Sequence, residues 1–358
     1  MKPQQFRDLF PALATTVWLD TPGSPPGALP VTRALAQAVA GWSSGDFDWL
    51  DWDAACDEAR QLFARFIKVP AQTVSTLGSL SEAAATVAGS LPEGRIVLSA
   101  ADFRSNLLPW QKRHDVVLVP PRDGGTHIDD LIAALDRDTV LLAVSEVTSG
   151  EGQRLDLQAL RRATDRVGVR LFVNLTQSLG ALHYDQAVVQ ADYVAVHGYK
   201  WLLCPRGAAW LVTREDRVDD LQPLAASWKS TGRPAGYFGA ASLAADASRC
   251  DVSPSWFSWI GACAALPLFA SLDPQQVETH VLHLAGLLTD EAENRGLERV
   301  ASGPCSHIVA LRTDDAAAVA ARLRVGSIRA TALEDRVRFG FHYFNTEQDV
   351  VTALKVLS

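Results

Sequence analysis

Between Arg95 and Val212 short apolar runs alternate with stretches of helical periodicity, and this alternation constrains the fold more than any other feature of the chain. We predict strands over residues 95–99, 115–119, 139–145, 170–174, 193–197 and 208–212, and helices over 106–113, 128–135 and 157–167. Strands that are apolar along nearly their whole length indicate a mainly parallel sheet covered by helices on both faces. Ligands bind such sheets at the carboxyl ends of the strands, where we expect Thr148, Ser149, Asn174 and Lys200.

The segments on either side of this α/β region are organised differently. Residues 1–30 include a short strand near Val17 and a Pro/Gly-rich stretch, as is typical of an arm and loop. Helical periodicity predicts helices over 31–42 and 53–67, and residues 227–239 are predicted to be a flexible loop. After residue 275, three helices and two strands form an α+β tail. The predicted units are an N-terminal arm (1–30), a large domain (31–262) and a small C-terminal domain (263–358).

Composition excludes several classes of function. The net charge is −8 without a block of basic residues, so a nucleic-acid partner is not expected. The longest uncharged stretch, Val252 to Leu272, contains serines and prolines, and we interpret it as a loop and a buried helix, not as a membrane span. The five cysteines form no Cys-x-x-Cys pair, which favours a reducing cytoplasm. His280 and His283 lack a third ligand, so no metal site is predicted.

One of only six lysines, Lys200, lies between Tyr199 and Trp201 and is followed by an apolar run. A lysine against apolar surface has a depressed pKa and can form a Schiff base. Taken alone, this pattern favours a surface lysine at the end of a strand.

Three separated motifs favour the interpretation of Lys200 as a Schiff-base lysine. They are LFVNLTQSLGAL from Leu171, VAVHGYKWLLCPRG from Val194, and VRFGFHYFNTEQDV from Val337. In this order they resemble the class V aminotransferase family of fold-type-I pyridoxal phosphate (PLP) enzymes, nearest the isopenicillin-N-epimerase-like and C–S lyase-like branch. The resemblance implies a large domain with a mainly parallel seven-stranded sheet, a small α+β domain, and a homodimer with shared active sites.

The resemblance also implies roles for individual residues. Lys200 would carry the cofactor and act as the base at Cα. Arg338 would bind the substrate carboxylate, with Asp20 and Thr21 at the substrate entrance. The other predicted cofactor-binding residues are Ser79, Leu80 and Ser81 in a phosphate-binding turn, Phe103 against the ring, Gln177 on the ring oxygen, Ser149, His197 and Tyr199, and Ser253 reaching the neighbouring subunit. Apart from the resemblance, the Gly/Ser turn could be only a helix cap, and Phe103 only a core residue.

Asn174 departs from the family pattern, which places Asp there to pair with the protonated ring nitrogen. An amide carries no charge, and losing a charge-assisted hydrogen bond costs roughly 1–3 kcal/mol. Three explanations remain open: the reaction needs less electron withdrawal, ring protonation is suppressed to steer the outcome, or the protein is an inactive relative.

We expect an enzyme of secondary metabolism that acts at Cα and Cβ of an amino-acid substrate. No cysteine lies between Val325 and Arg336, where desulfurases of the family carry their nucleophile. We therefore favour β-elimination of C–S lyase type on an S-substituted cysteine. Decarboxylative or oxidative deamination, transamination and epimerisation remain alternatives, and so does a PLP-free homologue without catalytic activity. The tryptophans Trp42, Trp49 and Trp52 are predicted to form an exposed loop cluster that suits a dimer contact.

Overall fold

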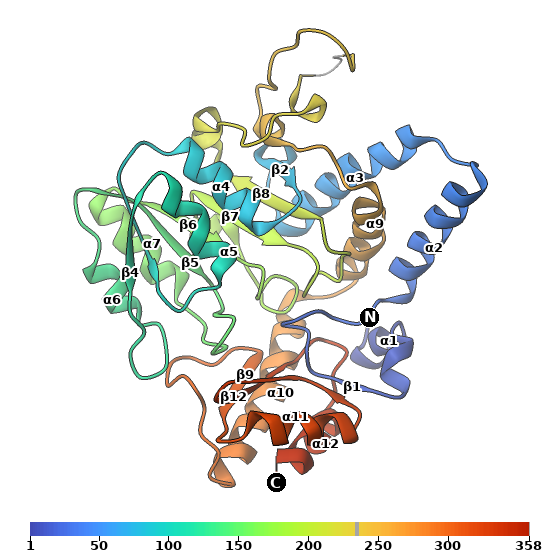
Figure 1. Cartoon of the computed structure of the whole chain (residues 1–358), viewed down its shortest axis with the longest axis vertical. Coiled ribbons are helices and arrows are strands. Elements are labelled where there is room, and N and C mark those ends of the chain that lie inside the picture. The colour runs from blue at the N-terminus through green and yellow to red at the C-terminus, as the bar shows by residue number, and fades with distance from the viewer. Residues whose placement is uncertain (233–235, 358) are drawn as a thin grey trace.

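A seven-stranded sheet forms the centre of the computed structural model, which describes residues 1–232 and 236–357 (Figure 1). The strand order is β2-β8-β7-β6-β5-β3-β4. The strands are β2 (Val74–Leu77), β3 (Arg95–Ser99), β4 (Asp115–Val119), β5 (Thr139–Ser145), β6 (Arg170–Asn174), β7 (Tyr193–His197) and β8 (Ala209–Thr213). The pairs from β4 through β7 are parallel, and only β8 pairs antiparallel with its neighbours β7 and β2. The predicted mainly parallel sheet is confirmed.

Alternating side chains of each strand are buried on opposite faces of this sheet, which explains why the strands are apolar throughout. On β6, Leu171 and Val173 join one hydrophobic cluster and Phe172 joins another. The first face is covered by α3 (Trp49–Ile67), α6 (Ile128–Ala133), α7 (Leu157–Val167) and α9 (Trp256–Ala270), and the second by α4 (Leu80–Ser90). Burying apolar surface on both faces is the main stabilising term, at about 25 cal/mol per Å².

The C-terminal part has its own antiparallel sheet of β11 (Thr331–Leu333), β12 (Arg336–Gly340) and β9 (Ile308–Arg312), packed against α10 (Pro274–Asn294), α11 (Ala316–Val325) and α12 (Glu347–Leu357). The N-terminal arm crosses to it, since β1 (Val17–Trp18) pairs in parallel with β10 (Ile328–Arg329). Figure 1 shows α1 (Pro3–Arg7) beside these C-terminal elements.

The predicted boundary between residues 262 and 263 falls inside α9, whose buried residues join the core of the large sheet. We propose that the boundary between the large and small domains lies at the break between α9 and α10, where the two helix axes bend by 90°. These helices meet the length and composition of a membrane span only as this bent pair, and no single helix in the described part of the chain does.

Three local predictions were wrong or incomplete. The helix predicted over 106–113 is two short pieces, α5 (Arg104–Leu107) and a 3₁₀ turn (Leu108–Lys112), because Pro109 cannot donate a backbone hydrogen bond. The tryptophans expected on a loop lie on helices: Trp42 on α2 (Leu29–Ser44), and Trp49 and Trp52 on α3. Of the predicted loop 227–239, residues 228–230 form a 3₁₀ turn and residues 233–235 lie outside the described residues.

Candidate active site

Lys200 lies in the turn that leaves β7, at the carboxyl end of the parallel strands. Its side chain is buried, and Nζ lies 5.7 Å from the ring centroid of Phe103 and 5.5 Å from that of Tyr199. The turn folds back on itself, with Leu203 N–H donating to the carbonyl of Lys200. The short sequence between β7 and β8 therefore places the amine between two aromatic faces.

The surroundings of Lys200 favour its neutral form. Burial first, and then the positive charges of Arg338 and Arg206, together lower its pKa from 10.5 to about 7 against the opposing effect of Asp20. A buried amine with this pKa is substantially unprotonated, and hence nucleophilic, at neutral pH. The same positive neighbours suit anionic groups such as a phosphate or a carboxylate.

Arg338 on β12 brings the C-terminal sheet to this site. One terminal nitrogen donates to the Ser149 carbonyl at 2.5 Å, and the other lies 3.9 Å from Asp20 Oδ1. Its Nε is buried and has no hydrogen-bond partner among the described residues. Burial lowers the pKa of Arg338, but a guanidinium stays charged in proteins. The structure thus brings the predicted Arg338 and Asp20 together, whereas Thr21 is fully buried and its predicted contact with substrate stays a prediction.

Gln177 and Ser149 lie together, but the amide of Gln177 is already occupied. Its Oε1 accepts from the Trp201 indole at 3.0 Å, and its Nε2 donates to the Pro22 carbonyl and to Ser149 Oγ, both at 3.2 Å. A ring oxygen would have to replace one of these partners, so the role of Gln177 stays a prediction. Trp201 is held close by Gly180, where an added Cβ would lie 2.4 Å from the Trp201 carbonyl.

The predicted phosphate-binding turn is the N-terminus of α4. Ser79 caps the helix, its Oγ accepting from Glu82 N–H at 3.2 Å, and the Glu82 carboxylate accepts from Gly78 N–H at 2.7 Å. Within the described residues Ser81 Oγ makes no hydrogen bond, and Ser79 Oγ only accepts one, so both hydroxyls can still donate to a ligand. Leu80 is buried, and it could contribute only its backbone N–H.

His197 and Tyr199 pack edge to face, with ring centroids 4.5 Å apart. Burial and the nearby Arg206 lower the pKa of His197 to about 4, so its imidazole is neutral. Nε2 accepts from Gly207 N–H at 3.3 Å, which leaves Nδ1–H as the donor. His197 can therefore donate one hydrogen bond to a phosphate, but it cannot supply a charge.

Asn174 ends β6 directly beside Ser145, which ends β5. Its Nδ2 donates to Ser145 Oγ at 2.9 Å, and its Oδ1 accepts from Thr176 N–H at 3.0 Å. Ser145 Oγ in turn donates to Asp102 Oδ1 at 2.8 Å. Asn174 and Phe103 were predicted from the sequence, but no role was predicted for Ser145, the last residue of β5, or for Asp102, which directly precedes Phe103.

Ser253 is exposed in the loop before α9, and no contact with the Lys200 site is found among the described residues. Nearby rings form an aromatic patch of Trp42, Phe47, Trp49, Trp52, Trp228, Tyr237, Trp256 and Phe257. Trp49 lies 5.3 Å from Tyr237 and 6.0 Å from Trp256, and Phe238, which follows Tyr237 in the sequence, is 96% exposed.

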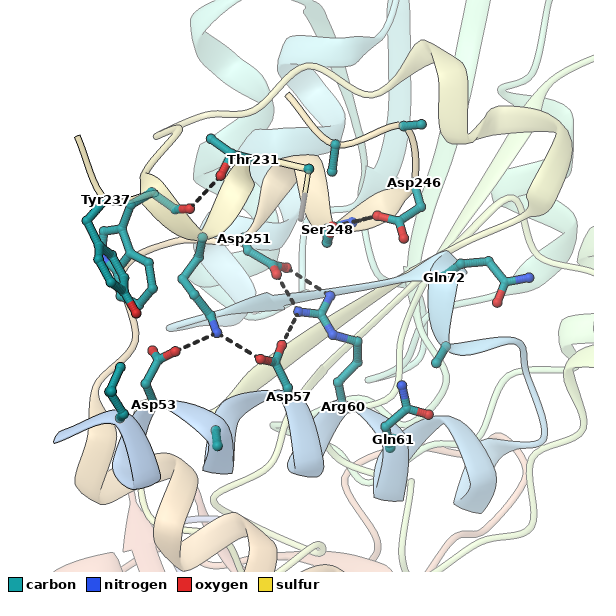
Figure 2. A pocket seen from close by; sticks show the side chains of 18 residues that line it. Asp53, Asp57, Arg60, Gln61, Gln72, Thr231, Tyr237, Asp246, Ser248 and Asp251 are labelled. Atoms are coloured by element: carbon teal, nitrogen blue, oxygen red, sulfur yellow. Dashed lines mark hydrogen bonds and ion pairs between the residues drawn. The ribbon is translucent and has the colours of Figure 1, made fainter. Parts of the chain in front are cut away.

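A charged cavity of about 930 Å³ opens beside this patch, and none of the predicted site residues lines it (Figure 2). Lys229 Nζ lies 3.1 Å from Asp53 and 3.0 Å from Asp57, and Arg60 pairs with Asp251. Asp251 also accepts from Thr76 N–H on β2 at 2.8 Å. Charges of opposite sign alternate along this network, so it ties α3 and the 251–255 loop to the edge of the sheet.

Two further histidines were not predicted. His307 lies 4.1 Å from Trp201 edge to face, and His342 stacks on Trp201 at 5.7 Å. Burial lowers the pKa of His307 to about 3 and that of His342 to about 4, so both are neutral residues that pack against Trp201.

Comparisons with known proteins agree with this arrangement. The family model described as "Aminotransferase class-V" matches residues 49–352. The chain is 28% identical to "Uncharacterized aminotransferase YcbU" of Bacillus subtilis, over 98% of this chain and 96% of that protein. It is 27% identical to isopenicillin N epimerase of Amycolatopsis lactamdurans, over 84% of each. Its fold is similar to that of the cystine C-S lyase C-DES in complex with its product cysteine persulfide, with a TM-score of 0.87, 20% identity, and coverage of 97% and 98% of the two chains.

Proposed function

The chain belongs to the class-V aminotransferase family of PLP-dependent enzymes, and from that premise we propose that it catalyses β-elimination on an S-substituted cysteine. The predictions of the family, of an enzyme and of PLP as cofactor are confirmed at the level of this family. The observation that carries the proposed reaction is a buried, partly neutral Lys200 beside Arg338, together with burial that raises the pKa of four of the five cysteine thiols.

The residues present fit PLP. Lys200 offers a nucleophilic amine between two rings, and Phe103, which is 49% exposed, offers a flat apolar face. The N-terminus of α4 with Ser81, the Nδ1–H of His197 and the positive charge of Arg206 suit a phosphate. Bound PLP supplies an electron sink for negative charge developing at the substrate α carbon.

The remaining steps fall to side chains of this chain. Arg338 would bind the substrate carboxylate, because its guanidinium forms paired hydrogen bonds and its Nε has no other partner in the described structure. That contact fixes the α carbon relative to Lys200. The neutral amine of Lys200, which is about half of the population at pH 7, then removes the Cα proton. The electron pair of the Cα–H bond forms a double bond between Cα and Cβ as the bond between Cβ and sulfur breaks, and the leaving thiolate takes up the proton held by Lys200 and departs as a thiol.

The cysteines favour elimination over sulfur abstraction by the protein. Burial raises the pKa of Cys56, Cys250 and Cys263 to about 12, and that of Cys204 further. These thiols therefore hold their protons and are poor nucleophiles at neutral pH. The exposed Cys305 contacts Arg299 at 3.1 Å in the C-terminal part. A released thiol is consequently the expected sulfur product.

Epimerisation is the second candidate, because the likeness to isopenicillin N epimerase extends over 84% of this chain. It needs the same proton removal at Cα but returns the proton to the other face, with no loss from Cβ. Transamination and deamination would instead leave the Cβ substituent in place, and a PLP-free homologue would have no need of a depressed lysine pKa.

Product analysis separates these reactions. The PLP-loaded protein is incubated with S-conjugated cysteines in deuterated water, and products are identified by mass spectrometry. Elimination yields thiol, pyruvate and ammonia. Deuterium at Cα without thiol release supports epimerisation, and a keto acid that retains its sulfur supports transamination. Lys200→Ala should abolish turnover, whereas the matched surface variant Lys112→Ala should not.

We also propose a homodimer that acts in the reducing cytoplasm. The aromatic patch supports an interface: Trp42 is 59% exposed and Tyr237 is 50% exposed, and such rings are enriched at the centres of protein contacts. Ser253 precedes Trp256 of this patch, so an interface here would bring Ser253 to the second copy. A secondary-metabolic substrate is consistent with the relatives and is part of the proposal.

A further inference from the structure

Three side chains form a hydrogen-bonded chain that starts at Asn174 and ends at a carboxylate. They come from the ends of adjacent strands: Asn174 from β6, Ser145 from β5, and Asp102 from the turn after β3. The bonds are Asn174 Nδ2 to Ser145 Oγ, 2.9 Å, and Ser145 Oγ to Asp102 Oδ1, 2.8 Å. Both Asn174 and Ser145 are buried.

The partners fix the direction of every bond in this chain. The backbone N–H of Thr176 can only donate, so the Asn174 atom that faces it at 3.0 Å is Oδ1. Nδ2 therefore faces Ser145 and donates to it. The hydroxyl of Ser145 then points its hydrogen at the carboxylate. All donors are directed toward Asp102, and Asn174 Oδ1 keeps one lone pair that no described residue uses.

Asp102 is a carboxyl group with no cationic partner among the described residues. It also accepts from Phe103 N–H at 2.6 Å and from Asn106 Nδ2 at 2.8 Å, so all three partners donate and favour the ionised form. Among the described residues it forms no ion pair. Burial raises its pKa, so a positive charge bound nearby would stabilise it. Its neighbour Phe103 lies over Lys200 Nζ, which puts this carboxylate in the same site.

We infer that Asp102 is the remote counter-ion of the cofactor ring, acting through Ser145 and Asn174 as positioning residues. The inference rests on the proposed function, in which the ring nitrogen of PLP is paired with residue 174. A protonated ring nitrogen would donate to the unused lone pair of Asn174 Oδ1. The bonds then run in one direction from cation to anion, an order in which each strengthens the next. The carboxylate that the family places at position 174 is thus supplied by Asp102, two hydrogen bonds away from Asn174.

The test measures ring protonation directly. Cofactor-free protein is loaded with PLP labelled with ¹⁵N in the ring, and the ¹⁵N chemical shift is recorded for wild type, Asp102→Asn, Ser145→Ala and the charge-exchange variant Asp102→Asn/Asn174→Asp. We expect a protonated shift in wild type. Asp102→Asn and Ser145→Ala should move it toward the unprotonated value and weaken PLP binding roughly tenfold. The double variant should restore both, because it returns one carboxylate to the ring.

Controls separate this inference from the proposed function. The exposed Asp129→Asn removes a charge from the same part of the fold and should change neither measurement. If wild type does not bind PLP, the proposed function fails and the inference fails with it. If PLP binds but its nitrogen is unprotonated in wild type, or its shift is the same in all variants, the inference alone is overturned. Should Asp102→Asn not fold, Ser145→Ala breaks the chain with the carboxylate retained and decides the question.

Discussion

Lys200 and Lys229 are two buried lysines whose replacement should change the stability of the cofactor-free protein in opposite directions. They are 6% and 9% exposed. Lys200 makes no ion pair within the described structure, and burial together with the nearby Arg338 and Arg206 lowers its pKa from 10.5 to about 7. A pKa lowered from 10.5 to about 7 corresponds, at 1.36 kcal/mol per pH unit, to about 5 kcal/mol. The free energy of unfolding is smaller by this amount at a pH where the lysine is protonated in both the folded and the unfolded chain.

The sign of the pH dependence follows from proton binding. Below pH 7 both states bind the proton, and the folded state bears the whole cost. Between pH 7 and 10.5 the unfolded chain binds a proton that the folded chain does not, so stability rises with pH by about 1.4 kcal/mol per unit. Lys200→Met removes the charge but keeps the length of the side chain. We expect the free energy of unfolding of this variant to exceed that of wild type by up to about 5 kcal/mol at pH 7, and by about 2 kcal/mol at pH 9.

Lys229→Met is the matched control. Burial lowers the pKa of Lys229, but its contacts with Asp57 and Asp53 outweigh burial and raise it above 10.5. Lys229 is thus protonated in both states through pH 9. Its loss leaves Asp53 without its cation and Asp57 with Arg60 alone, and should lower the free energy of unfolding by about 3 kcal/mol at every pH in this window. Urea unfolding followed by tryptophan fluorescence at pH 7, 8 and 9 measures both variants. A Lys200→Met variant that is less stable than wild type, or a difference that does not shrink with pH, would refute the reasoning.

Three further predictions concern the substrate, the cofactor face and the assembly. Arg338→Lys should raise KM for the amino acid about 100-fold with little change in kcat, because a lysine cannot form the paired hydrogen bonds; an unchanged KM would remove Arg338 from the substrate site. Phe103→Ala should weaken PLP binding about tenfold by equilibrium titration, whereas the exposed control Leu108→Ala should not; equal affinities would rule out ring contact. Light scattering should give the mass of two chains for wild type and of one chain for the double variant Trp42→Ser/Phe238→Ser. The control Val325→Ser, at a residue that is 88% exposed on α11, should keep the two-chain mass. An active wild-type monomer would contradict the dimer.

Most of the sheet could be predicted from the sequence because each central strand is apolar on both faces. The predicted and observed bounds agree for β3, β4, β5, β6 and β7. Helix ends were less predictable: α3 begins at Trp49 because Asp48 caps it, four residues before the apolar periodicity starts. Helix-to-strand order also placed Lys200 and Asn174 at strand ends, where the structure has them.

Contacts that depend on register across the sheet could not be predicted. Ser145 meets Asn174 only because β5 and β6 pair in that register, and Asp102 reaches them from a turn more than forty residues earlier. The occupied amide of Gln177 likewise depends on Pro22 and Trp201, which come from different parts of the chain. Sequence motifs name residues at a site but do not show which of their polar atoms are already paired.

The measurement that tests the central claim most directly is the position of the cofactor on the chain. The PLP-loaded protein is reduced with borohydride, digested and mapped by mass spectrometry, with the visible absorbance of the loaded protein recorded beforehand. The chain has only six lysines, and we predict a single pyridoxyl adduct on Lys200 that is lost, together with the absorbance, in Lys200→Ala. An adduct on Lys229 or on another lysine, or no adduct at all, would contradict the assignment of this site.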